Sequence, residues 1–222
     1  MKISSLQKGL VGHWTMSQDS LKGSLLADKT PYENDGTIYG ATFATDRMGQ
    51  PNKCMYFDGV DDYIDCGNSS NLNIVRGISV SIWVKTFSLS TKGHIVSRYG
   101  STGQQYSLYQ STTGLILYIN GGGSANALTA PNIFSLNNWI YIVGLFDNIS
   151  KKQEVFINGI SLANRTYNVE INNPNEKTII GNCAFLDDPF NGLIDDVRIY
   201  NRALSQAEIT TLYNSYNPKI IL

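Results

Sequence analysis

Carboxylate and amide oxygens crowd one stretch near the start of the chain, DKTPYENDG at residues 28–36. Hard oxygen donors of this kind are what Ca²⁺ binds, typically about six to eight at a time. The stretch lacks the spacing of an EF-hand loop, so a metal site here must be completed by distant residues. The alternative interpretation is that Asp28 and Asn34 only cap turns, as short polar side chains often do.

A second carboxylate of interest lies in the segment GLIDDVRIYN near the end of the chain. Strand alternation places Asp195 on the same face as Leu193, Val197 and Ile199, and we expect this face to point into the core. A charged carboxylate is costly to bury without partners. Asp195 is therefore predicted to have either a cation or several hydrogen-bond donors beside it.

A sugar site normally combines an aromatic platform with polar side chains, because sugar rings have apolar faces and hydroxyl rims. Trp83 and Trp139 fall within the most hydrophobic runs, so we assign both to the core. Better candidates lie on polar middle strands or in nearby loops, although Tyr also favours strands for its own packing. The predicted ligand surface consists of Arg98, Tyr99, Gln104, Tyr106, Tyr109, Asn126, Asn182 and Phe185.

The acidic residues and histidines do not form a recognisable catalytic set. Glycoside hydrolysis needs two carboxylates at a fixed separation, but Glu occurs only at positions 33, 154, 170, 176 and 208. Asp61, Asp62 and Asp65 cluster beside a predicted turn, where solvated carboxylates are common. His13 and His94 lie far apart, and neither adjoins a nucleophile motif. We therefore predict that the protein is not an enzyme.

The elements that must position these residues are strands. In ISVSIWVKTF, Ile78, Val80, Ile82 and Val84 alternate with more polar positions, which indicates a half-buried strand. Further runs of about five to nine residues follow, separated by Gly, Asn, Ser or Pro. Ten or more such strands without amphipathic helices between them predict an all-β, two-sheet antiparallel jelly-roll sandwich.

The segment CMYFDGVDDYIDCG suggests a hairpin, because Asp-Gly favours a tight turn between two β-rich runs. A turn centred on Val60 sets Phe57 opposite Tyr63 and Cys54 opposite Cys66. An odd total of three cysteines argues against a disulfide framework. We expect Cys54 and Cys66 to be cross-strand neighbours that remain thiols.

One helix is expected near the end of the chain. Ser205 and Glu208 have the spacing of a capping box, in which each side chain can bond the other residue's backbone N–H. Ile209 and Leu212 follow at helical spacing. These residues predict a short C-terminal helix over about residues 206–213.

Charge and length limit the remaining possibilities. The 222 residues contain 17 Lys+Arg and 18 Asp+Glu, a net charge of −1, so bulk charge attracts neither nucleic acid nor an anionic membrane. We find no signal peptide and no stretch long enough for membrane insertion. We expect an extracellular or virion-surface location, with the cytoplasm as the alternative. Sandwiches often reach this length as one unit, so we predict a single domain over 1–222 with its core at about 9–214.

In order and spacing, seven segments resemble the laminin-G-like (LamG) domains of the concanavalin A-like jelly-roll superfamily, in their bacterial and phage type. The segments are GLVGHWTM, LADKTPYENDGTIYG, MYFDGVDDYIDCG, ISVSIWVK, NNWIYIVGLFD, EVFINGISL and NGLIDDVRIYNRALSQAEITTLYN. The resemblance implies two packed sheets, a surface for sugars or proteins, and often a structural calcium ion. Carried over to this chain, the implied Ca²⁺ ligands are Asp28, Asn34 and Asp195, with backbone carbonyls of residues 34–36.

Two functions fit these observations. The first is a non-catalytic, lectin-like module that binds a glycan. The second is a phage capsid or tail decoration protein that adheres mainly through contacts with a surface protein. The fold alone does not choose between them, because one fold supports many ligands.

Overall fold

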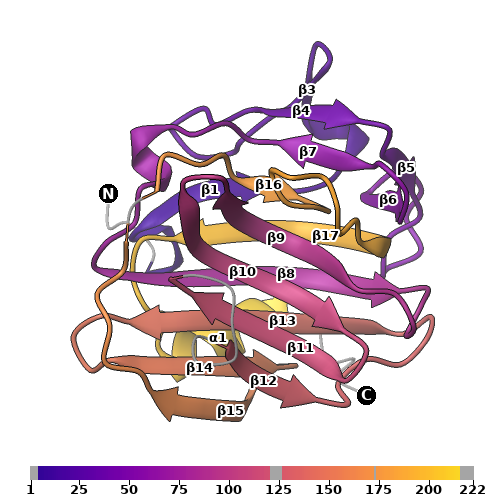
Figure 1. The fold of residues 1–222 in the computed structure, drawn as a ribbon. Coiled ribbons are helices and arrows are strands. Elements are labelled where there is room, and N and C mark those ends of the chain that lie inside the picture. The colour runs from indigo at the N-terminus through magenta and orange to yellow at the C-terminus, as the bar shows by residue number, and fades with distance from the viewer. Residues whose placement is uncertain (1–4, 121–126, 173, 216–222) are drawn as a thin grey trace.

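The computed structural model describes residues 5–120, 127–172 and 174–215, and shows two antiparallel sheets packed face to face (Figure 1). We call the eight-stranded sheet sheet A. Its strand order is β15 (Ile160–Thr166), β14 (Lys152–Ile157), β13 (Trp139–Asp147), β8 (Gly77–Thr86), β17 (Asn191–Tyr200), β6 (Cys54–Asp58) and β5 (Thr42–Ala44), and β1 (Leu10–Trp14) also pairs with β17.

Sheet B has nine strands and lies in front of sheet A in Figure 1. Its order is β12 (Ala127–Pro131), β11 (Gly114–Ile119), β10 (Gly103–Ser111), β9 (Gly93–Gly100), β16 (Ile179–Ile180), β7 (Tyr63–Asp65), β4 (Gly36–Tyr39), β3 (Leu25–Leu26) and β2 (Leu21–Lys22). The two-sheet sandwich predicted from the strand pattern is confirmed.

The main core lies between the sheets. Ile78, Val80, Ile82 and Val84 of β8 all point into it, as their alternation predicts. A second apolar cluster covers the outer face of sheet A, around Trp83. The central strands of sheet A are therefore buried on both faces, whereas sheet B keeps part of its outer face available.

The helical elements are few and short. In the described part of the chain, three 3₁₀ turns, η1 (Ser5–Gln7), η2 (Gln18–Ser20) and η3 (Ser70–Leu72), accompany one α-helix, α1 (Gln206–Ser215). The capping box is confirmed: the Ser205 N–H donates to Glu208, and the Glu208 N–H donates to the Ser205 hydroxyl. Ile209 and Leu212 anchor the helix on the second cluster. No helix among the described residues is long and apolar enough to cross a membrane.

The predicted hairpin around Gly59 is wrong. β6 pairs with β5 and β17 in sheet A, while β7 pairs with β4 and β16 in sheet B. The Asp-Gly turn therefore carries the chain from one sheet to the other, so Cys54 does not pair with Cys66 and Phe57 does not pair with Tyr63. Turn residues indicate that the chain reverses, but not which strands bond across the turn. Cys54 and Cys66, like Cys183, are buried free thiols.

The inward orientation predicted for Asp195 is also wrong. A bulge interrupts β17 between Asp195 and Arg198, and Asp196 has a left-handed φ of 48°. The extra residue reverses the alternation, so Val197 faces the core while Asp195 lies opposite Trp83 on the outer side of sheet A. Asp195 is still buried, and its partner there is the guanidinium of Arg47.

Candidate functional site

A pocket of about 370 Å³ opens on the outer face of sheet B, and we call it the sheet B pocket. Tyr63 and Asp65 of β7 and Ile179 of β16 line it on the sheet side. Phe185 and Leu186 line it from the loop between β16 and β17, residues 181–190, here named the β16–β17 loop. This volume is within the range of pockets that bind small ligands, about 300–1,000 Å³.

The short strand β7 orients the sheet side of the pocket. Ile64 is fully buried and pairs with Ile38 and Ile180, so its neighbours Tyr63 and Asp65 must point outward. Tyr39, directly opposite Tyr63 on β4, stacks on it with ring centroids 4.5 Å apart and planes inclined by 13°. The pair forms a broad aromatic surface at the pocket's edge.

The β16–β17 loop is fixed to sheet B by hydrogen bonds. The Ser97 hydroxyl donates to the carbonyl of Asn182 at 2.9 Å, and the Ala184 N–H donates to the carbonyl of Tyr99 at 3.0 Å. These bonds set Phe185 edge-on to Tyr99, with ring centroids 5.2 Å apart. Phe185 nevertheless stays 48% exposed, so much of its ring is available to a ligand.

An aromatic row continues from the pocket across β9, β10 and β11. His94 lies 5.7 Å from Tyr99 and 4.7 Å from Tyr109, and Tyr109 lies 6.1 Å from Tyr118, all measured between ring centroids. Burial lowers the pKa of His94 to about 4, so the imidazole is neutral at pH 7. Its Nδ1 is 2.7 Å from the Ser107 hydroxyl. The row therefore offers an uncharged aromatic face.

Polar side chains form the other end of the pocket. The Lys177 ammonium lies 2.5 Å from the Asp65 carboxylate, and this bond raises the pKa of Lys177. The Asn68 side-chain amide donates to the side-chain oxygen of Asn175 at 3.0 Å. Glu176 is buried and accepts a hydrogen bond from the backbone of residue 102. Donors and acceptors thus stand beside the aromatic walls.

The predicted ligand residues separate into two groups. Tyr99, Tyr109 and Phe185 lie together on the outer face of sheet B. The other described candidates are 0–2% exposed and fill the interior, so they do not belong to a ligand surface. They are Arg98, Gln104, Tyr106 and Asn182. Asn126 lies outside the described residues.

Arg98 and Tyr106 illustrate why part of this prediction was wrong. They pair across β9 and β10, directly opposite one another, where the ladder is irregular between Gln104 and Tyr106. The Arg98 guanidinium is held by Asn73 and by the Thr178 hydroxyl, and the Tyr106 hydroxyl lies 3.3 Å from Thr178. Polar composition of a strand therefore did not show which side chains were exposed.

Sequence reasoning missed the sheet side of the pocket altogether. Tyr63 and Asp65 flank a buried isoleucine with period-2 spacing, which is a usable indication of outward orientation. Lys177 comes just before β16. No local pattern indicates that the β16–β17 loop brings Phe185 into the same pocket as Tyr63 and Asp65.

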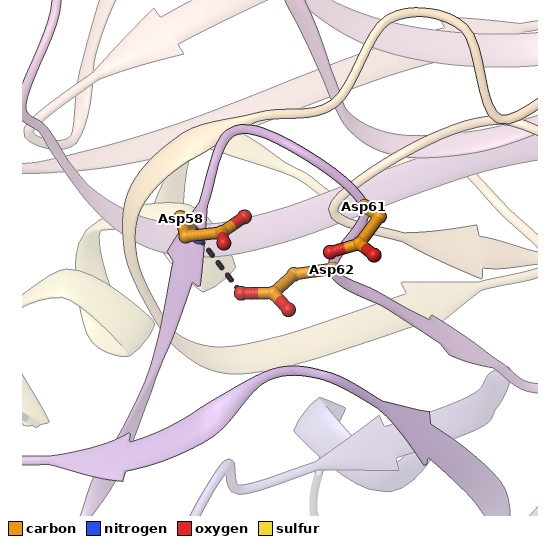
Figure 2. A group of neighbouring side chains, drawn as sticks. All are labelled: Asp58, Asp61 and Asp62. Atoms are coloured by element: carbon orange, nitrogen blue, oxygen red, sulfur yellow. Dashed lines mark hydrogen bonds between the residues drawn. The ribbon is translucent and has the colours of Figure 1, made fainter.

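A group of three carboxylates lies at the end of β6 and in the connection from β6 to β7. Ligand oxygens of Asp58, Asp61 and Asp62 lie within 4.8 Å of one another, so they could hold a metal ion (Figure 2). Figure 2 also shows the bond by which Asp62 accepts the backbone N–H of Asp58, at 2.8 Å. Burial, followed by the charges of its two neighbours, raises the pKa of Asp62.

The three residues implied as Ca²⁺ ligands have protein partners. Asp28 and Asn34 do lie together, because Asp28 accepts both the backbone and the side-chain N–H groups of Asn34. The carboxylate of Asp195 instead accepts a hydrogen bond from Arg47. The contacts of Asp28 fit the turn-capping alternative, and calcium binding by this chain stays a prediction.

Comparison with solved structures finds proteins that share this fold. Domain 4 of AbnA, a GH43 extracellular arabinanase from Geobacillus stearothermophilus, was solved in complex with arabinotriose. It superposes with a TM-score of 0.70 and 24% identity, over 92% of this chain and 98% of that one. The binding domain of botulinum neurotoxin DC, solved in complex with SialylT, gives a TM-score of 0.72 at 14% identity, over 95% of this chain and 52% of that one.

Sequence comparison gives a related result. Botulinum neurotoxin type X from Clostridium botulinum is 24% identical over 181 residues, which is 76% of this chain but only 13% of the toxin. A family model described as the concanavalin A-like lectin/glucanases superfamily (Laminin_G_3) matches residues 58–210. The family resemblance read from the seven segments is confirmed, and the chain belongs to the concanavalin A-like lectin/glucanase superfamily.

Proposed function

We propose that this protein is a non-catalytic glycan-binding module and that its binding site is the sheet B pocket. The observation that carries the proposal is the combination of exposed aromatic walls with paired donors and acceptors in one hollow. Tyr63 and Phe185 can cover the apolar face of a sugar ring, while Asp65 and Lys177 stand where ring hydroxyls would lie.

The chemistry of the pocket supports binding more than catalysis. Its two carboxylates are Asp65 and Glu176, and each already has a partner in the protein. A glycosidase needs one carboxyl group that can donate a proton and a second that can act as nucleophile or base. Because Asp65 is bonded to Lys177 and Glu176 to the backbone of residue 102, neither pocket carboxylate is free for such a role.

The relatives support the same class of ligand. One was solved with arabinotriose and another with SialylT, and both share this fold. A likeness of fold carries no ligand by itself. It does make a sugar the first class of compound to test against the pocket.

The experiment is a glycan array followed by calorimetry with the strongest binders. Phe185→Ala and Tyr63→Ala each remove an aromatic wall, and each should weaken binding at least about tenfold, since stacked aromatic rings are frequent hot spots. Ile160→Ala is the matched control, because Ile160 is 72% exposed on β15 in the other sheet. Thermal melts check that all three variants fold.

Two results would count against the proposal. One is an array on which no glycan binds. The other is glycan binding that is unchanged by both pocket variants, which would place the site elsewhere. The virion role and the extracellular location stay predictions, and genes neighbouring the one for this protein would test them.

A further inference from the structure

We infer that the sheet B pocket selects uncharged glycans and rejects those that carry carboxylate or sulfate groups. This inference rests on the proposed function and deepens it. It is drawn from the distribution of charge around the pocket, which is strongly uneven.

Two carboxylates line the pocket and two more lie next to its wall in the sequence. Asp65 and Glu176 line it, and Asp187 and Asp188 follow directly after the wall residue Leu186. Among the described residues that line the pocket, Lys177 is the one cation. The balance on this part of the surface is therefore clearly negative, although the whole chain is nearly neutral.

Among the residues that the structure describes, neither Asp187 nor Asp188 has a cationic partner. The Tyr109 hydroxyl donates to Asp188 at 3.1 Å, and the Cys183 thiol donates to Asp187 at 3.2 Å. Both donors are neutral, so these bonds orient the carboxylates without cancelling their charge. The effect is visible on Tyr109, whose pKa is raised by burial and then by Asp188.

The cationic side chains of Lys177 and Arg98 are already bonded to other protein groups. Lys177 is bonded to Asp65, so an anionic ligand that drew Lys177 away would leave Asp65 without its partner. Arg98 lies within electrostatic range of Glu176 and offsets part of that charge. However, Arg98 is fully buried and donates to Asn73, so it has no free face to present to a ligand.

An uncharged sugar meets none of this repulsion. Its hydroxyls can accept from the Lys177 ammonium and donate to the Asp65 carboxylate without separating the pair, since both groups retain further hydrogen-bonding capacity. An added carboxylate or sulfate would instead bring negative charge close to Asp187 and Asp188, which adjoin the wall residue Leu186, and the described lining residues include no cation besides the paired Lys177. Like charges placed opposite each other are a general means of rejecting wrong partners.

The test uses matched pairs of oligosaccharides with the same sugar residues, in which the carboxylates are either free or methyl-esterified. Trigalacturonate is compared with its methyl ester, and sialyllactose with its methyl ester, within a panel that also contains arabinotriose. Wild-type protein should bind the neutral member of a pair more tightly, and the preference should shrink as salt is raised, because salt screens exposed charges.

The decisive variant is the double substitution Asp187→Asn with Asp188→Asn. Each Asn keeps an oxygen that can accept the existing hydrogen bond, so the loop should hold its shape. Affinity for acidic oligosaccharides should rise about tenfold, while affinity for neutral ones stays unchanged. Asp19→Asn is the control, because Asp19 is an exposed carboxylate that neither lines the pocket nor adjoins a lining residue in the sequence.

The possible results separate the two claims. The inference is overturned if acidic oligosaccharides are the strongest ligands of the wild-type pocket, or if the double variant leaves the ratio of acidic to neutral affinity unchanged. The proposed function itself fails, and the inference with it, if no member of the panel binds or if binding is insensitive to Phe185→Ala.

Discussion

Asp28 shows how a single side chain can organise a loop in this sandwich. Its two oxygens accept five hydrogen bonds, from the backbone N–H groups of His13, Thr30 and Asn34 and from the side chains of Thr30 and Asn34. These donors join β1 to the segment before β4. A carboxylate satisfied in this way needs no cation to be stable when buried.

Asp28→Asn should therefore destabilise the protein by about 3 kcal/mol, because the new amide presents N–H groups to donors that need an acceptor. Urea titration at pH 7 measures the change. Asp19→Asn is the control, since Asp19 makes an exposed ion pair with Lys53 that should contribute little. Equal effects in the two variants would show that the hydrogen bonds to Asp28 do not matter.

His94 should make the stability of the folded protein depend on pH. Its pKa falls from 6.5 to about 4 in the folded protein because burial disfavours the charged ring. The unfolded chain then takes up a proton at higher pH than the folded chain. The stability that depends on neutral His94 is complete above pH 6.5 and is lost as the pH falls through about 4.

We expect the imidazole of His94 to titrate near pH 4 by NMR, and the wild-type protein to lose roughly 3 kcal/mol of stability between pH 7 and pH 4 through this group. The reference is His94→Gln, which lacks the titrating ring and should show a correspondingly flatter dependence on pH. A ring that titrates near its ordinary pKa would contradict the expectation.

At the scale of the element, two features of the chain's last part show what local pattern does and does not determine. The capping box around Ser205 was predictable because all its atoms lie within one turn of chain. The bulge at Asp196 was not, because it arises where β17 bonds to both β1 and β8. Alternation along β17 alone therefore put Asp195 on the wrong face.

Ser205→Ala should lower the stability of the protein by about 1 kcal/mol, because it removes the acceptor for the Glu208 N–H at the start of α1. Ser205→Thr retains a hydroxyl at the cap and should recover most of the loss. Urea titration compares the three proteins. An alanine variant as stable as the wild type would mean that the cap contributes nothing.

At the scale of the whole molecule, the two sheets approach each other closely at Gly144 of β13. A Cβ atom at this position would lie 2.6 Å from Cδ2 of Leu108 and 3.1 Å from Cδ1 of Leu117, both in sheet B. Glycine thus sets the local spacing between the sheets. Its backbone does not have a positive φ, so the requirement is for space rather than for conformation.

Gly144→Val should destabilise the sandwich by about 2 kcal/mol, the usual range for overpacking a filled core. The same substitution should be less damaging in a Leu108→Ala background, where the removed side chain leaves room. A double-mutant cycle measured in urea tests this coupling. Strictly additive effects would show that the two residues do not compete for space.

The sandwich and its strands could be predicted because period-2 alternation is written into each strand separately, as in β8. That β6 and β7 pair in different sheets could not be predicted, because a turn sequence does not determine which strands pair on either side of it. For the site, Phe185 was found as an aromatic in a loop. Tyr63 was missed, because its role depends on a loop more than 100 positions away, which only the folded chain brings near.

The β16–β17 loop also has a mechanical consequence. It runs from the pocket directly into β17, which is bonded to β8 along most of its length, to β6 at its start and to β1 at its end. Tension on a ligand held by Phe185 would pass along the backbone into that strand and spread over many hydrogen bonds at once. If this pocket held a ligand fixed to an immobile surface, a force on the protein would therefore act on β17, a strand that is hydrogen-bonded to three others.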